Sequence, residues 1–169
     1  MREGRFSAAA SEIAQRYSES VSFDWRLYRH DIAGSIAHAS ALSAAGILTA
    51  DEFELITRGL REIESEIAAG KLTWDQLLED VHMNIEAALT KRIGPAGGKL
   101  HTERSRNDQI ALDLRLYSRE EINEIVIRLR TLRNALLLLA QRNSEVLMPG
   151  YTHLQRAQPI ILRITCSPS

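Results

Sequence analysis

The residues best suited to chemistry gather in a polar stretch that runs from Gly97 to Gln109 and contains a single apolar residue. Its basic side chains, which supply hydrogen-bond donors, are Lys99, His101, Arg104 and Arg106. An arginine side chain can bind a carboxylate through two parallel hydrogen bonds. Candidate caps for the helical pattern that follows are Ser105, Asn107 and Asp108, and a capped helix start favours an anion. The stretch therefore suits a carboxylate-rich small molecule, with a solvated connecting loop as the alternative.

A second polar stretch, from Met148 to Pro159, also contains residues that could do chemistry. Thr152 and His153 are adjacent in it, and two glutamines add amide groups. A histidine titrates near neutral pH and can move a proton. Because two prolines and a glycine interrupt the stretch, we expect a fixed loop and neither a helix nor a strand.

The elements that must position these stretches are helical. Residues 1–23 lack a strong period, and we expect an extended approach to the first helix. A helical pattern then runs from Asp24 to Ala45, and Gly46 can end it in the left-handed conformation. From its position alone, Asp24 is an N-cap, with a role in a site as the alternative.

Two further helical patterns follow before the polar stretch. The first opens with Thr49 and Glu52 at the spacing of a capping box and closes at Gly70. The second opens at Asp80, the expected cap, and ends at the glycine-rich residues 94–98. By position alone His82 is expected at the surface, and a polar core residue or a ligand contact stays open as an alternative.

The dominant pattern, from Asn107 to Arg142, predicts a helix roughly 50 Å long at about 1.5 Å per residue. Its apolar positions recur every three or four residues and form a stripe wider than one coiled-coil seam, so the helix needs partners on more than one side. The predicted fold class is all-α. Such a helix would hold the two polar stretches at opposite ends, and symmetric association of antiparallel copies would bring one chain's second stretch beside another's first.

The overall composition is that of an ordinary globular protein. The chain has 169 residues, 44% of them hydrophobic and 25% charged, with a net charge of −1, which does not indicate nucleic-acid or anionic-membrane binding. One cysteine, Cys166, allows neither an internal disulfide nor a cysteine-based zinc site. The first residues do not resemble a signal peptide, and the most apolar run, residues 135–140, is too short to span a bilayer. We therefore expect a cytoplasmic protein.

Seven blocks of this sequence, in order, resemble argininosuccinate lyases, a branch of the fumarase, aspartase and adenylosuccinate lyase superfamily. They are Gly4-Arg5-Phe6, Ser20-Val-Ser-Phe-Asp24, Asp31-Ile-Ala-Gly-Ser35, Glu79-Asp-Val-His-Met-Asn-Ile-Glu86, Gly98-Lys-Leu-His-Thr102, Ser105-Arg-Asn-Asp-Gln109 and Pro149-Gly-Tyr-Thr-His-Leu-Gln-Arg-Ala-Gln-Pro159. The resemblance covers about residues 4–160. It implies an N-terminal helical domain over residues 1–103, and over residues 104–160 the first long helix of a central bundle with an active-site loop after it.

The resemblance also implies a reaction and a set of site residues. The reaction is the reversible cleavage of argininosuccinate to arginine and fumarate by β-elimination, in arginine biosynthesis, with no cofactor and no metal. The enzyme is expected to be a homotetramer whose sites draw on three subunits. The residues implied to hold the substrate are Ser20, Asp24, Arg106 and Asn107, with Asp80 and His82 near them. Thr152 is implied to bind a carboxylate, and His153 to assist proton transfer.

Two departures from the family pattern are visible. Glu103 stands where the family usually has glycine or another small residue, and its charge should weaken anion binding unless Arg104 or Lys99 neutralises it. Family chains are also more than twice as long and contain a mobile serine loop that this chain lacks. We therefore expect the chain to be inactive alone. The alternatives are a non-catalytic structural protein on the same fold, as in the related lens crystallins, another lyase of the superfamily, or a helical interaction module.

Residues 161–169 form a tail that does not resemble the family. Under a chosen set of synonymous codons for Arg163 to Pro168, a shifted reading frame spells His-His-Leu-Leu-Ala, which typically opens the next bundle helix. We expect that a frameshift near the codons for Ile161 and Leu162 produced this tail, and that the tail is disordered.

Overall fold

The computed structural model describes residues 12–163, which form two compact units that divide between Tyr117 and Ser118. Each unit is described by itself. Most of the predicted tail, Cys166 included, lies outside the described residues. No helix of the described part of the chain is long and apolar enough to cross a membrane.

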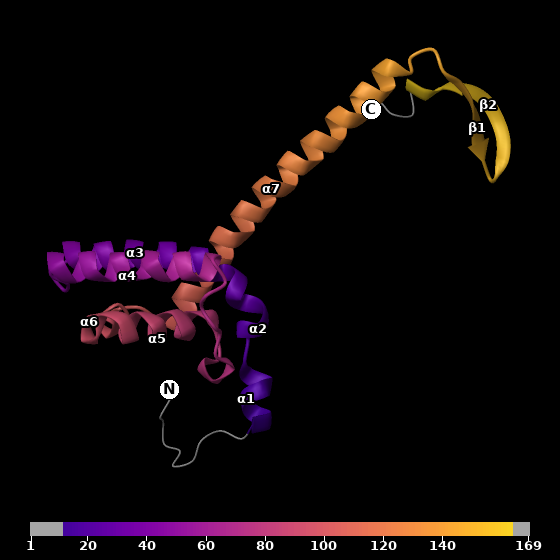
Figure 1. Cartoon of the computed structure of the whole chain (residues 1–169). Helices are drawn as coiled ribbons and strands as arrows, with labels where there is room; N and C mark the ends of the chain where they lie inside the picture. The colour runs from indigo at the N-terminus through magenta and orange to yellow at the C-terminus, as the bar shows by residue number, and fades with distance from the viewer. Residues whose placement is uncertain (1–11, 164–169) are drawn as a thin grey trace. The chain divides into compact units, whose positions relative to one another are not determined.

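The first unit consists of helices (Figure 1). They are α1 (Glu12–Ser18), α2 (Val21–Asp24), α3 (Tyr28–Ala44), α4 (Ala50–Ala68), α5 (Val81–Ile93), α6 (Pro95–Lys99) and the first turns of α7 (Arg106–Arg142), with 3-10 turns η1 (Trp25–Leu27) and η2 (Gln76–Leu78). Helix α4 packs between α3 and α5. The core between them is aliphatic, and its fully buried members include Ile32, Ile56, Leu60, Ile63, Val81 and Leu89. Burial of these side chains supplies the main driving force for packing.

Local signals set the ends of these helices as the sequence predicts. The Thr49 side chain accepts from the backbone N–H of Glu52, and the Glu52 carboxylate accepts from the N–H of Thr49, which completes a capping box. Asp80 caps α5 by accepting from the N–H of Met83 at 2.7 Å. Gly46 has a φ of 74° after α3, the left-handed conformation that glycine adopts freely.

Two predictions for the first unit are wrong. The segment before Asp24 is not wholly extended, because α1 and α2 lie within it. Asp24 does not cap the helical turn that follows it, since its side chain makes no cap hydrogen bond there. The cause is tertiary: the backbone N–H groups of Ser20 and Val21 both donate to the carbonyl of Glu79, which docks this segment against the start of α5. Such long-range contacts leave no periodic trace in the sequence.

The second unit contains the rest of α7 and an antiparallel hairpin of β1 (Leu147–Thr152) and β2 (Gln155–Ile161). The prediction of a fixed loop without strands is therefore wrong, because the stretch is a hairpin, although the fold is otherwise helical as predicted. His153 and Leu154, with φ of 48° and 62°, form the two-residue turn whose twist suits a hairpin. Pro149 pairs with Pro159, which is tolerated because both strands of a two-stranded sheet are edges.

The part of α7 in the second unit leaves a row of large apolar side chains exposed. Its most exposed members are Ile122 at 60%, Leu129 at 59% and Leu132 at 57%. The predicted long helix is confirmed, and it presents the unpartnered apolar stripe that the sequence indicates.

Candidate functional site

The start of α5 brings three of the predicted site residues together. The Ser20 hydroxyl donates to Oδ2 of Asp24 at 2.6 Å, and the backbone N–H of Val81 donates to Oδ1 of Asp24 at 3.1 Å. Asp80 lies next to Val81 and caps the helix. Burial raises the pKa of the Asp24 carboxyl, against the opposing effect of the Ser20 and Val81 hydrogen bonds. Two carboxylates and a hydroxyl therefore meet at one helix end.

Arg106, the first residue of α7, faces the same region. Its Nε lies 3.8 Å from Oδ2 of Asp80, and its Nη2 donates to Oε2 of Glu86 at 3.2 Å. A cavity of about 440 Å³ opens here, and its polar lining residues include Asp80, Glu86, His101 and Arg106. The side chain of Asn107 is exposed, and its backbone N–H donates to the Ser105 hydroxyl. The cavity thus has both acidic groups and a guanidinium on its wall.

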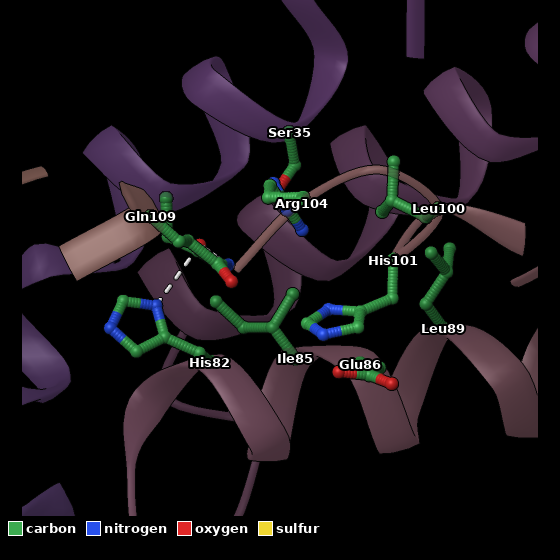
Figure 2. Close-up of a pocket in the computed structure, with 10 residues that line it drawn as sticks. Ser35, His82, Ile85, Glu86, Leu89, Leu100, His101, Arg104 and Gln109 are labelled. Carbon is green, nitrogen blue, oxygen red and sulfur yellow. Dashed lines mark hydrogen bonds and ion pairs between the residues drawn. The ribbon is translucent and has the colours of Figure 1, made fainter. Parts of the chain in front are cut away.

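Two basic side chains of the polar stretch before α7 bind other groups of the protein, although the composition of the stretch suggests donors that are free to bind a ligand. Arg104 turns inward, and its Nη1 donates to the Ser35 hydroxyl at 3.0 Å, so it is not a surface donor (Figure 2). Lys99 pairs with Glu52. Neither cation therefore pairs with Glu103, which has a φ of 55° in the left-handed region that suits glycine.

Behind these residues lies a buried polar cluster built from three helices. Nδ1 of His82 on α5 lies 3.1 Å from Oδ1 of Asp31 on α3 and 3.5 Å from Oδ2 of Asp113 on α7. The Nε2 group of Gln109 also donates to Oδ1 of Asp31. His82 is 2% exposed, so the expectation that it lies at the surface is wrong. Its imidazole lies beside Ile85 and below Gln109 in Figure 2.

Burial and charge shift the pKa values in this cluster. Burial raises the pKa of Asp113 to about 7, with the neighbouring charge of Asp31 acting in the same direction. For His82, burial acts to lower the pKa, but the hydrogen bond and charge of Asp31, together with Asp80 and Asp113, outweigh it and raise the pKa. Burial lowers the pKa of the Arg104 guanidinium. Asp113 is therefore a buried carboxyl group that changes protonation near neutral pH.

Asp31, His82 and Asp113 offer three ligand atoms within 4.8 Å of one another, a spacing that a metal ion could use. The Asp31 and His82 atoms, however, are already hydrogen-bonded to each other. The adjoining cavity has a volume of about 10 Å³, room for no more than one water. We therefore interpret the trio as a buried polar cluster and not as a metal site.

Thr152 and His153 belong to the second unit. Thr152 ends β1, and His153 is the first residue of the hairpin turn; both side chains are exposed. The left-handed backbone at His153 is unusual for a non-glycine residue and is often found at functional positions.

Sequence reasoning gave no site role to Asp31, Gln109 or Asp113. A signal was present, because Gln109 and Asp113 are four residues apart and so share one face of α7. Both are buried, whereas Asp108 beside them is exposed. Two buried polar side chains one helical turn apart indicate a polar partner opposite them, which is Asp31.

Comparison with known proteins points to one family. The sequence matches the family described as Lyase over residues 4–167. It is 57% identical to the argininosuccinate lyase of Azotobacter vinelandii and 55% identical to that of Hahella chejuensis, in each case over 93% of this chain and 34% of the relative. The chain therefore spans about a third of the length of these curated relatives.

Solved structures show the same fold. An EDDS lyase variant with bound fumarate superposes with a TM-score of 0.71 at 26% identity, over 95% of this chain and 32% of that one. A fumarate lyase from Mesorhizobium sp. BNC1, at 22% identity, gives a TM-score of 0.63 over 95% of this chain and 37% of that one.

Proposed function

The chain belongs to the lyase family, and we propose that it forms part of an argininosuccinate lyase, which cleaves argininosuccinate to arginine and fumarate. The observation that carries this proposal is the meeting of Asp24, Asp80 and Arg106 at the start of α5, beside a cavity of about 440 Å³. Argininosuccinate carries a substituted guanidinium and several carboxylates. Acidic side chains complement the former, and an arginine complements the latter.

In this proposal the site residues share the work of a β-elimination. A base removes a proton from the carbon next to a carboxylate, and the C–N bond to the guanidino nitrogen breaks as an acid returns a proton to that nitrogen. Arg106, Asn107 and Thr152 bind carboxylates and stabilise the charge that develops on them. Ser20, Asp24 and Asp80 hold the guanidino end, and His82 lies behind them. His153 assists proton transfer.

The second group of residues reaches the first, we propose, through association of copies. Thr152 and His153 sit on an exposed hairpin turn, and the apolar stripe of α7 is suited to pack against other copies. The homotetramer and the cytoplasmic location that the family resemblance implies are part of this proposal. No cofactor is required, because proton transfer and charge stabilisation are sufficient for the elimination.

A chimera tests the proposal directly. Residues of this chain replace the matched 34% of the Azotobacter vinelandii relative, and fumarate release from argininosuccinate is followed by its ultraviolet absorbance. We expect activity in the chimera, a large loss in Arg106→Ala, and little change in Arg115→Ala, a control nine residues further along the same helix. A folded chimera that binds argininosuccinate but releases no fumarate would refute the assignment.

A further inference from the structure

Two hydrogen-bonded paths leave the carboxylate of Asp31 and end at residues of the proposed site. One is direct, from Oδ1 of Asp31 to Nδ1 of His82 at 3.1 Å. The other passes through Gln109, whose Nε2 donates to Asp31 and whose Oε1 accepts from Nη1 of Arg106 at 2.5 Å. Asp31 is 1% and Gln109 4% exposed, so bulk solvent has little access to the Asp31 and Gln109 ends of these bonds. A single buried carboxylate thereby orients both a histidine and an arginine.

The Gln109 side chain suits its place chemically. An amide has a donor on one atom and an acceptor on the other, so it can link a carboxylate to a guanidinium. A glutamate at this position would present an oxygen to Asp31 and repel it. A glutamine at this position can therefore link Asp31 to Arg106, whereas a glutamate cannot.

Asp113 lies close to Asp31 and His82, but no group in the described part of the chain donates a hydrogen bond to its carboxylate. It is 0% exposed, and neither of its carboxylate oxygens has a hydrogen-bond partner among the described residues. Nδ1 of His82, 3.5 Å from Oδ2 of Asp113, is already hydrogen-bonded to Asp31. Carboxyl oxygens of Asp31 and Asp113 lie within 4.8 Å of each other, and burial of two like charges this close favours the neutral form of the group that lacks a donor, which is Asp113.

The charged groups around Asp113 agree with this assignment. Asp31 faces it from α3, His82 from α5 and Arg104 from the connection before α7. Burial and the charge of Asp31 raise its pKa to about 7 in spite of the two cations. Among the neighbouring carboxylates, Asp80 acts to raise the pKa of His82 and Glu86 acts to raise that of Arg104.

We propose that Asp31 is a positioning residue for His82 and Arg106, and that Asp113 holds it in place as a neutral carboxylic acid whose O–H donates to Asp31. The importance of His82 and Arg106 rests on the proposed function. The hydrogen-bonded arrangement itself is a property of this chain and is testable without substrate.

Nuclear magnetic resonance of the unmodified 169-residue chain gives the first test. With ¹⁵N-labelled histidine, we expect neutral His82 to carry its proton on Nδ1, the atom that faces Asp31. With ¹³C-labelled aspartate, we expect the Asp113 carboxyl to be protonated at pH 5 and to titrate near pH 7. A proton on Nε2 of neutral His82, or an ionised Asp113 at pH 5, would overturn the proposal without any variant.

Substitutions separate positioning from general structural support. Asp31→Asn should lower the proton affinity of His82 by on the order of tenfold or more, since it removes the nearby negative charge. Asp113→Asn, whose amide can still donate to Asp31, should keep the Nδ1 proton of His82, whereas Asp113→Ala should not. Asp108→Asn, on the exposed face of α7, is the matched control and should change neither signal.

The results discriminate clearly. If His82 in folded Asp31→Asn keeps both its proton affinity and its tautomer, Asp31 does not position it. Should that variant fail to fold, the measurements on the unmodified chain still decide. Fumarate release by the chimera tests the lyase assignment separately, so failure of one proposal is distinguishable from failure of the other.

Discussion

Replacement of Asp113 by asparagine should change how the stability of this chain depends on pH. The carboxyl group is fully buried, and its pKa is about 7 in the folded chain against 3.8 for the ordinary group. Asparagine has nearly the same shape and is neutral at every pH. Comparison of the two proteins therefore isolates the cost of ionising Asp113 inside the fold.

The sign and size of the effect follow from linkage. Because the pKa is raised on folding, Asp113 contributes stability while it is protonated, and this contribution is lost as pH rises through the folded pKa. Between pH 5 and pH 8, the free energy of unfolding of the unmodified chain should fall by about 2 to 3 kcal/mol relative to Asp113→Asn, at about 1.36 kcal/mol per pKa unit. His82, whose pKa is also raised, adds a slope of the same sign to both proteins.

Urea unfolding at four pH values, followed by circular dichroism, measures this difference. Denaturant slopes should match between the two proteins, which shows that the same surface is exposed on unfolding. Asp108→Asn serves as the control and should run parallel to the unmodified chain. Parallel curves for Asp113→Asn and the unmodified chain, or a gain of the unmodified chain over the variant as pH rises, would refute a buried neutral acid.

Three further outcomes are expected. In the chimera, His153→Asn should lower kcat by on the order of 10²–10⁴ with a smaller change in substrate binding, and an unchanged kcat would leave His153 only a turn residue. Glu103→Gly should raise stability by about 1 kcal/mol by relieving the left-handed backbone, and should tighten substrate binding in the chimera; equal or weaker values would show that Glu103 is accommodated without cost. The chain alone should associate through the apolar stripe of α7, and a monomer in sedimentation velocity at all concentrations would contradict this.

Local signals account for what the sequence predicts well. The capping box at Thr49, the cap at Asp80 and the left-handed Gly46 each act within one turn of their own position, so the helix ends are readable from neighbours. The long helix is predictable for a similar reason, since its period persists over 37 residues.

The predictions of secondary structure are wrong where distant contacts or an unusual backbone conformation determine the local structure. The docking of residues 20–21 on the Glu79 carbonyl makes short helices that have no period. In the hairpin, prolines at 149 and 159 argue against strands, yet they pair with each other at an edge. The turn has two non-glycine residues, His153 and Leu154, at positive φ. It therefore lacks the asparagine–glycine pair from which such a turn is usually predicted.

The candidate site likewise has one part that the sequence predicts and one part that it does not. Ser20, Asp24, Asp80 and Arg106 were predicted through a family resemblance, and the structure brings them together. The cluster behind them was missed because single buried polar residues look like surface ones in a helical pattern. Its partners come from α3, α5 and α7, and their approach depends on the packed fold.

The buried cluster is difficult to explain by stability alone. A buried set of charged and polar groups often stabilises a fold less than apolar residues of the same volume, because desolvation offsets the attraction. Here Asp31, His82 and Asp113 occupy positions beside an otherwise aliphatic core, where leucine or isoleucine would pack at no electrostatic cost. Apolar residues, however, could not orient Nδ1 of His82. Nor could they hold the Arg106 guanidinium at the edge of the cavity, as Asp31 does through Gln109. Fixed orientation of groups that bind a charged substrate reduces the reorganisation needed when it arrives. The cost of the buried charges is therefore best understood as the cost of keeping Arg106, which we propose binds the substrate, and the neighbouring His82 in one orientation.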